Sequence, residues 1–427
     1  MKKALSNPKS SSTIKALSYK YQNILMVIGL VLSFSGGSWD ITFHILSQPE
    51  SFFSYPHSLV YSGILLVIFV FLVNIRKNLS EEKAIKKNNF IILAGIILIL
   101  TAGPFDFSWH LKFGLDGLLS PPHLTLLTGW LLIAIGNLRI TNIRVIRAGT
   151  KVENESISSQ FDSTQRSSKR SKVAEDEVLV NDQSNKKQNE HSKRGNFKSK
   201  NKISLYQIQL FLNLSILLMI ISGFLYFFSL PFSETQSYNF NPPPFLALFV
   251  YGLGFPILFS GYFLKILTKY PDIRIMVPMV GTFYVIITLV TQISSNSFLT
   301  GYTGYYLLNL IPFILFYLAN SHSSAFDSSK SENQLNKQKY VFSARNSKYA
   351  ILGIVFALLS YSLCFPLNTY IYNEEIYGYL IYQYMVVEVY QMVFSENFMI
   401  ILVMSAVGGF VGYLLSQSMS IPVRLKI

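Results

Sequence analysis

Long apolar runs recur along the whole chain of 427 residues, and they constrain its fold more than any other feature. A run of about 20 apolar residues can cross the hydrocarbon layer of a membrane as an α-helix. Half of all residues are hydrophobic and only 14% are charged, which argues against a soluble globular fold. We predict an all-α, polytopic integral membrane protein with about ten transmembrane helices, over residues 22–46, 57–74, 89–112, 122–140, 204–230, 244–264, 275–293, 302–321, 348–366 and 397–416.

The net charge of +14 follows a membrane topology and does not indicate a nucleic-acid partner. With a cytoplasmic N-terminus, the inner segments and the helix ends beside them contain every lysine and arginine except Lys112, which is the positive-inside pattern. We therefore predict a multi-pass protein of the plasma (cytoplasmic) membrane with both termini in the cytoplasm. The first apolar run is longer than a signal-peptide core, and we expect it to be a retained span. The single cysteine, Cys364, excludes intrachain disulfides and cysteine-based metal sites.

A polar segment, residues 141–203, divides the chain into two membrane modules. It contains few large apolar residues, so we predict a disordered cytoplasmic linker. Its basic excess favours contact with anionic lipid headgroups and leaves RNA or an acidic protein as alternatives. Residues 1–140 would form a four-helix module, and residues 204–427 a six-helix module whose role the sequence does not indicate. Within the latter, the aromatic stretch 377–394 is short for a span, and we expect it to lie in the outer interface or to re-enter the membrane.

One polar motif occurs twice in the first module. Residues 37–63 and 103–129 align without a gap and share GxxDxxxH, eleven further residues, PH, five residues and G. Four of the six histidines of the chain occupy this register, so we interpret the segments as an internal duplication of a two-helix hairpin near the external face. The matched pairs are Gly37 with Gly103, Asp40 with Asp106, His44 with His110, Pro56 with Pro122, His57 with His123, and Gly63 with Gly129.

Each copy of the motif can bring a carboxylate and two imidazoles together. Asp and His at positions i and i+4 share one helical face. A serine N-cap followed by proline, at Ser54 or Ser120, would place the second histidine at the outer start of the returning helix. Such sets suit copper, non-haem iron or zinc, while hydrogen bonding across the helices and haem ligation are alternatives. The predicted metal ligands are Asp40, His44 and His57 in the first copy, and Asp106, His110 and His123 in the second.

The second copy, DFSWHLKFGLDGLLSPPH, resembles the C subunit of the copper-dependent membrane monooxygenases that oxidise methane, ammonia or short hydrocarbons. In that family the first site reads roughly DxxWH(x)4RDTxFTPSH, and a second site with Asn, His and His lies nearby. The resemblance covers about residues 20–140. It departs from the family at Leu115, where the family has Arg, and at Asp40, where it has Asn. Asp106, His110 and His123 match the three copper ligands, and Trp109, Asp116 and Pro121 match the accompanying Trp, Asp and Pro.

The resemblance implies an integral membrane metal-binding protein with copper as the expected ion, iron or zinc as alternatives, and oxygenase-type chemistry as the reaction it would catalyse. Glu50 and Asp116 each lie six residues after the first histidine of their copy, and we expect them, with Trp109, to support the ligands. Two other functions fit the same residues, a copper-handling or sensing protein without catalysis and a membrane haem or quinone protein. The expected partners are the lipid bilayer and either further membrane subunits or a second copy of the chain.

Overall fold

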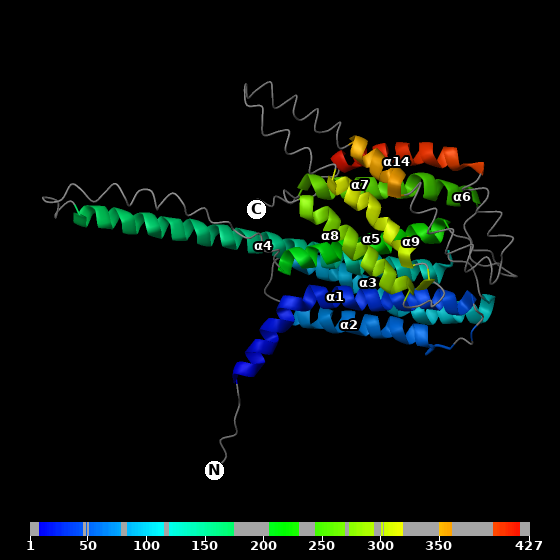
Figure 1. Ribbon diagram of the computed structural model, residues 1–427. Coiled ribbons are helices and arrows are strands. Elements are labelled where there is room, and N and C mark those ends of the chain that lie inside the picture. The colour runs from blue at the N-terminus through cyan, green and yellow to red at the C-terminus, as the bar shows by residue number, and fades with distance from the viewer. Residues whose placement is uncertain are drawn as a thin grey trace, which may run out of the picture.

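The protein is a bundle of helices that lie side by side (Figure 1). The computed structural model describes residues 8–45, 48, 51–77, 83–114, 119–174, 205–229, 244–269, 273–293, 300–301, 303–318, 350–360 and 396–418. These residues are helical apart from short connections, and no strand occurs among them. The prediction of an all-α fold is therefore confirmed for the part of the chain that the structure describes. The stretch 377–394 lies outside it.

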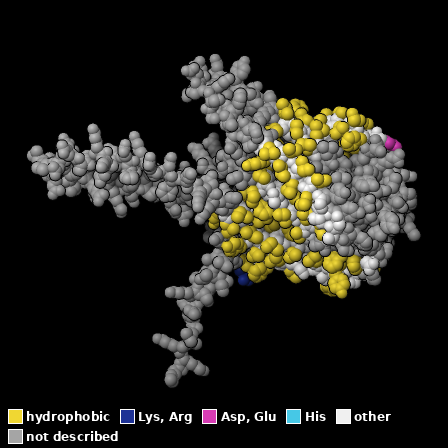
Figure 2. Space-filling view, in the orientation of Figure 1, with side chains coloured by type: hydrophobic (Ala, Val, Ile, Leu, Met, Phe, Trp, Pro, Cys, Tyr) yellow, Lys and Arg dark blue, Asp and Glu magenta, His cyan; other side chains and the backbone are white. Residues whose placement is uncertain are grey.

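Seven of the described helices are long and apolar enough to span a membrane. Large hydrophobic side chains lie exposed along them, among them Leu65 and Phe69. Figure 2 shows hydrophobic side chains over most of the described face of the bundle, as contact with lipid acyl chains requires. These properties make the chain a multi-pass membrane protein. The spans lie within α1 (Pro8–Ile45), α2 (Tyr55–Lys77), α3 (Lys83–Phe113), α4 (Pro121–Ala174), α5 (Leu205–Ser229), α8 (Ile273–Ile293) and α14 (Phe398–Ser418).

The other three predicted spans fall on shorter apolar helices, so within the described residues seven of the ten predicted spans are long enough to cross a membrane. Two of the three are interrupted close to a proline, whose missing N–H breaks the α-helical ladder. A π-helical turn, in which the Phe255 N–H donates to the Val250 carbonyl, precedes Pro256, and a 3-10 turn precedes Pro312. The short helices are Val250–Tyr262, Leu308–Leu318 and Ala350–Ser360. The first consists of η3 (Val250–Gly254) and the start of α7 (Phe255–Lys269), and it follows α6 (Pro244–Phe249). The second begins with η5 (Leu308–Leu310) and follows α9 (Thr303–Leu307).

Two antiparallel helix pairs, α1 with α2 and α3 with α4, form the first module, and each is held by a close backbone contact. In the first pair, a Cβ atom added to Gly63 would lie 2.5 Å from the carbonyl oxygen of Gly29. In the second pair, a Cβ atom added to Gly95 would lie 2.6 Å from the carbonyl oxygen of Gly129. No side chain fits at these points, so the helix backbones touch. Gly95 and Gly129 each lie 66 residues after Gly29 and Gly63, and the same offset separates Asp40 from Asp106.

A cluster of buried polar side chains joins these pairs to α5. Asn137 of α4 donates a hydrogen bond of 2.6 Å to Oδ1 of Asn213 of α5. Arg144 donates to Oδ1 of Asn23 of α1 at 3.0 Å and to Oδ1 of Asn74 of α2 at 3.3 Å. Because an unsatisfied polar group in an apolar interior costs about 1–3 kcal/mol, the hydrogen bonds hold four helices in one register. The two halves of the chain are therefore parts of one bundle.

In the second half, α14 packs closely on η3 and α7. A Cβ atom added to Gly412 would lie 2.4 Å from the carbonyl oxygen of Ile257, and one added to Gly408 would lie 2.9 Å from that of Leu253. Ser260 of α7 donates a hydrogen bond of 2.8 Å to the carbonyl oxygen of Gly409. Small residues thus let these two helices approach as closely as the helices of the first module do.

Helix α4 continues far beyond the bundle, as Figure 1 shows, and this differs from the predicted linker. We predicted disorder over 141–203 because the segment cannot bury a core, but residues 141–174 continue the helix. A helix satisfies its backbone hydrogen bonds internally and needs no core, and no proline interrupts the sequence before Ala174. The prediction was therefore wrong for 141–174, and residues 175–203 lie outside the described part of the chain.

The glycine contacts can be tested at Gly63. We expect Gly63→Val to force α1 and α2 apart and to destabilise the protein by about 1–3 kcal/mol, as overpacking of a close contact does. Thermal unfolding of the detergent-solubilised protein, followed by circular dichroism, measures the change. The matched control is Ser62→Val at the neighbouring exposed position, which should leave the unfolding temperature almost unchanged. Equal unfolding temperatures for both variants would contradict the assigned contact.

The buried amide pair of Asn137 and Asn213 allows a second stability test. Each single change to Ala leaves the other amide buried without its partner and should cost about 1–3 kcal/mol. The double variant should cost less than the sum of the two, because it leaves no orphaned amide. The same thermal unfolding experiment on the four proteins gives this difference. Strictly additive costs would show that the hydrogen bond does not couple α4 to α5.

Candidate metal centre

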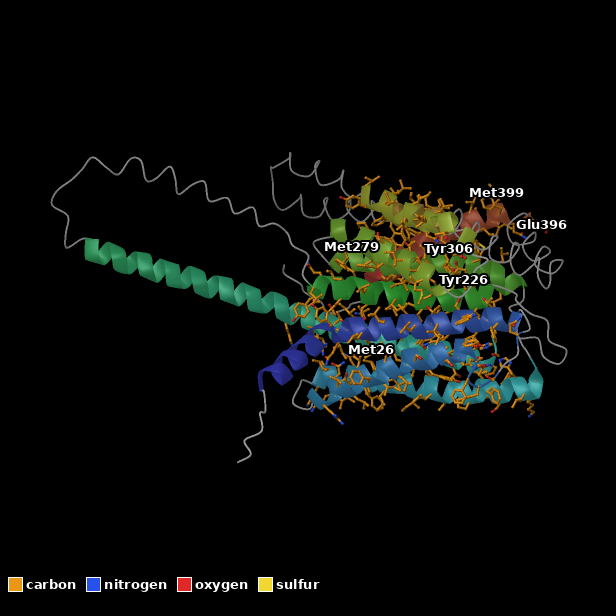
Figure 3. All side chains as sticks on the ribbon, turned by 60° about the horizontal axis from the view of Figure 1, so that its bottom comes forward. Met26, Tyr226, Met279, Tyr306, Glu396 and Met399 are labelled. Atoms are coloured by element: carbon orange, nitrogen blue, oxygen red, sulfur yellow. The ribbon has the colours of Figure 1, made fainter. Side chains whose placement is uncertain are left out.

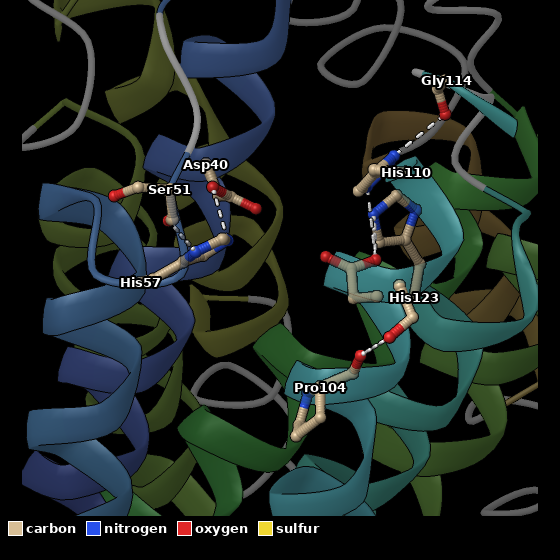
Figure 4. Close-up of polar contacts among 9 residues, drawn as sticks. Asp40, Ser51, His57, Pro104, His110, Gly114 and His123 are labelled. Carbon is tan, nitrogen blue, oxygen red and sulfur yellow. Dashed lines mark hydrogen bonds and ion pairs between the residues drawn. The ribbon is translucent and has the colours of Figure 1, made fainter. Parts of the chain in front are cut away.

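Five of the six predicted ligands have described side chains, and all five lie at one end of the bundle (Figure 4). Asp40 stands near the end of α1, and His57 in the first turn of α2. Asp106 and His110 lie in the last turns of α3, and His123 in the first turn of α4. In each hairpin, the histidine on the returning helix therefore lies at the same level as the aspartate on the outgoing helix.

The serines that precede the returning helices explain part of this placement. The carbonyl oxygens of Ser54 and Ser120 accept the first helical hydrogen bonds, from the N–H groups of Ser58 at 2.9 Å and Leu124 at 3.1 Å. Both serines thus hold the predicted N-cap positions. Their hydroxyl groups are buried and form no hydrogen bond within the described structure. The predicted helix starts are confirmed, whereas capping by the serine side chains is wrong.

Asp106 faces two imidazoles in the second hairpin. Its Oδ1 atom lies 3.4 Å from Nε2 of His110 and 3.4 Å from Nε2 of His123. The two imidazole rings are tilted, with centroids 5.8 Å apart. The side chains are between 6% and 14% exposed, so water screens their interactions only weakly. The three residues predicted from the motif therefore converge on one point.

Asp40 and His57 form the corresponding pair in the first hairpin. Oδ1 of Asp40 lies 3.2 Å from Nε2 of His57, and both side chains are nearly buried. Asp40 also stands close to the second hairpin, because ligand atoms of Asp40, His57 and Asp106 all lie within 4.8 Å of one another. Ligand atoms of Asp106, His110 and His123 meet the same limit. Asp106 belongs to both groups, so the two motifs form one connected cluster.

The other ring nitrogen shows how two of the imidazoles are protonated. Nδ1 of His110 lies 3.1 Å from the carbonyl oxygen of Gly114, and Nδ1 of His57 lies 3.0 Å from that of Ser51. A carbonyl only accepts hydrogen bonds, so each Nδ1 carries the donating proton. A neutral imidazole then keeps a lone pair on Nε2, and this lone pair points at a carboxylate oxygen. Such a contact is favourable only when a cation, either a second proton or a metal ion, lies between the two atoms.

The two carboxylates pose the same electrostatic problem. Asp40 and Asp106 approach within 4.8 Å, where two negative charges repel by about 3 kcal/mol at an effective dielectric constant of about 20. Burial beside apolar helices adds a desolvation cost for each charge. A cation bound among the imidazoles and carboxylates would remove both penalties. The chemistry of this donor set therefore fits a metal ion.

The other predicted site residues are placed differently or lie outside the described side chains. His44 continues α1 one turn after Asp40, but its side chain is outside the described part, as are Glu50 and Asp116. The Trp109 ring lies along α3 between Phe105, which it meets edge-on at a centroid distance of 5.7 Å, and Phe113, to which it is tilted at 4.5 Å. Trp109 therefore packs against aromatic neighbours on its own helix.

A cavity of about 130 Å³ lies between the two hairpins. The four groups at its polar end are Asp40, His57, Asp106 and His123. Most of the remaining lining is aliphatic or aromatic and comes from all four helices of the first module, including Phe34, Ile99, Ala102, Leu126, Leu127 and Trp130. The cluster therefore borders a partly open, mainly apolar space.

Helices of the second half supply the remaining wall, which the motif analysis missed. The Phe227 ring of α5 meets the His123 ring edge-on at a centroid distance of 6.4 Å. Gly223 brings the α5 backbone so close that an added Cβ atom would lie 2.8 Å from Phe34. Tyr226 of α5 and Tyr306 of α9, which also line the cavity, lie on neighbouring helices in Figure 3. Nothing in the sequence links these positions to the motif, because they belong to the unduplicated half of the chain.

The motif analysis found Gly63 and Gly129 but missed Trp130 and the glycines Gly29 and Gly95, although the sequence carried a signal for these two glycines. Extending the gapless alignment towards the N-terminus matches Gly29 with Gly95 and Asn23 with Asn89. Trp130 has no such signal, since its counterpart in the first copy is Ile64. Its indole N–H donates to Oγ of Ser33 at 2.9 Å, which ties the second hairpin to the first.

Comparison with known proteins gives no further assignment. No protein-family model, no curated protein and no solved structure matches this chain.

Proposed function

We propose that the protein is an integral membrane metal-binding protein whose Asp–His cluster holds copper. The observation that carries the proposal is the contact of one carboxylate oxygen, Oδ1 of Asp106, with Nε2 of both His110 and His123 at 3.4 Å. Two ligands at about 2.0–2.1 Å from a tetrahedral metal ion stand roughly 3.3 Å apart. The observed separations match that spacing and exceed the common N–H···O distance of about 2.9–3.0 Å. Copper, and not zinc or iron, is proposed from the resemblance to the copper-dependent membrane monooxygenases.

The cluster is proposed to be a single dinuclear centre with Asp106 shared between two ions. One ion would be held by Asp106, His110 and His123, and the other by Asp40, His57 and Asp106. His44, four residues after Asp40 as His110 is after Asp106, would complete the second set. The common membership of Asp106 in both groups supports one centre over two separate ones. The hydrogen bonds from Nδ1 to backbone carbonyls would fix the two rings, as they commonly do for metal-bound histidines.

Copper bound there would supply one-electron redox chemistry, and the resemblance points to an oxygenase-type reaction. The residues of the chain would hold the ion, orient the imidazoles and border the reaction space with an apolar wall. The recurring glycine contacts and the polar motifs at the same offset of 66 residues support our proposal that the two hairpins arose by duplication. The positive-inside pattern supports ten spans in the plasma membrane, with both termini inside and the centre near the external face.

Metal binding can be tested directly on the purified full-length protein. After loading with copper, iron or zinc and removal of excess ions, we expect copper to remain by elemental analysis and electron paramagnetic resonance. His123→Ala, and the double variant Asp106→Ala with His110→Ala, should weaken retention at least tenfold, because each removes a ligand of the central group. Ser108→Ala is the matched control on the exposed side of α3. Equal metal content in wild type and double variant would refute the proposal, and a Soret band would favour haem.

Stoichiometry tests the shared carboxylate. We expect two copper ions per chain in the wild type and one in Asp40→Ala, because that change leaves Asp106, His110 and His123 intact. Asp106→Ala should lower occupancy at both positions, since it removes the ligand that the two groups share. Copper per protein from elemental analysis gives these numbers. Loss of a single equivalent in Asp106→Ala, with the other bound as tightly as before, would show two independent sites.

A further inference from the structure

The size and polarity of the cavity beside the cluster limit which ligands can bind there. Its volume of about 130 Å³ is close to that of an engineered apolar cavity of about 150 Å³ that accepts benzene, so it has room for about six non-hydrogen atoms. The walls formed by Ile99, Leu126 and Leu127 favour a hydrocarbon body. The cavity is therefore suited to a small molecule with an apolar body.

The polar end of the cavity restricts the head group of that molecule. Two carboxylates and two imidazoles face it, and these groups would lose hydration without compensation beside a wholly apolar ligand. A hydroxyl group can donate a hydrogen bond to a carboxylate oxygen and offer its own oxygen lone pairs to a cation. A charged ammonium group would compete with the cation that the cluster itself requires. The environment thus favours a neutral head group that both donates and accepts.

We propose that this cavity binds a short-chain alcohol of up to about six non-hydrogen atoms, with its hydroxyl group at the Asp40–Asp106 end and its carbon chain against the apolar wall. The proposal builds on the proposed metal centre, because it names the ligand class of the same site. Helix α5 closes the pocket: Phe227 packs against His123, and Gly223 leaves no space between α5 and Phe34. The second half of the chain is therefore part of the binding site.

Trp130 offers a reporter inside the pocket. It is one of three tryptophans in the chain, it lines the cavity, and only 3% of its surface is exposed, so a quencher that enters the cavity meets its ring. Changing Trp39 and Trp109 to Phe leaves it as the sole emitter. Bromine quenches tryptophan on contact. Fluorescence titration of the full-length protein with 3-bromo-1-propanol, and with 1-bromopropane as its apolar counterpart, then measures binding.

We expect saturable quenching by 3-bromo-1-propanol, with a half-saturation concentration about tenfold or more below that of 1-bromopropane, because a hydrogen bond to a charged group is gained. Ala102→Phe, which fills the cavity from α3, should abolish saturation. Ile97→Phe, an exposed position on the same helix, is the matched control and should retain it. If Ala102→Phe does not fold, Leu126→Phe fills the cavity from α4 and serves the same purpose.

Other outcomes overturn the proposal. Linear quenching that is unchanged by Ala102→Phe would show that no pocket binds the probe. Equal half-saturation for 1-bromopropane would refute the alcohol class, as would tighter binding of 3-bromopropylamine. The titrations are done on metal-free and on copper-loaded protein, which separates this proposal from the metal centre. Saturable quenching in a protein that retains no copper would support the alcohol-binding pocket and refute the metal centre. Copper retention without saturable quenching would support the metal centre and refute the pocket.

Discussion

The geometry of the centre depends on how closely the two helices of each hairpin approach. Gly29 with Gly63 and Gly95 with Gly129 bring the backbones into contact, and Gly36 extends this contact towards the site, since a Cβ atom there would lie 2.8 Å from the Pro56 carbonyl oxygen. An imidazole on the returning helix is short, so it meets a carboxylate on the outgoing helix only when the backbones are this near. Larger side chains at these positions would push the helices apart and separate the carboxylate from the imidazole. The polar motif therefore depends on glycine contacts on the same helices, before the aspartate on the outgoing helix and after the histidine on the returning one.

The second constraint on the cluster is electrostatic. Carboxylates buried between apolar helices lose hydration, and a buried ionic group seldom stabilises a fold by itself. The Nδ1 protons of His57 and His110 are directed to backbone carbonyls, which turns the Nε2 lone pairs towards Asp40 and Asp106. This arrangement is unfavourable without a positive charge among the four groups, which either a second proton on the imidazoles or a bound metal ion would supply. The amides around Arg144, by contrast, are paired with complementary partners and need no added charge.

Sequence periodicity predicted the all-helical fold well, because helical periodicity is a local property of the chain. It placed Asp106, His110 and His123 together, since hairpin return and i, i+4 spacing suffice for that. It did not predict that Asp106 is shared with Asp40 and His57, because contacts between the two hairpins are not part of either copy. The helix over 141–174 differs from the prediction for another reason. Low hydrophobicity there predicts that the segment buries no core, but a single helix without proline needs no buried face.

The second half of the chain carries no polar motif, yet it determines what the centre can contact. Four helices arranged as two hairpins would leave the groove between them open to lipid acyl chains. Phe227 and Gly223 of α5 seal that groove against His123 and Phe34, and the buried amides of Asn137 and Asn213 fix α5 in register with α4. The cavity beside the cluster is therefore bounded by both halves of the chain. The Asp and His side chains of the cluster and much of the apolar wall beside them thus come from different parts of the sequence, which is why the motif alone identifies the first set and not the second.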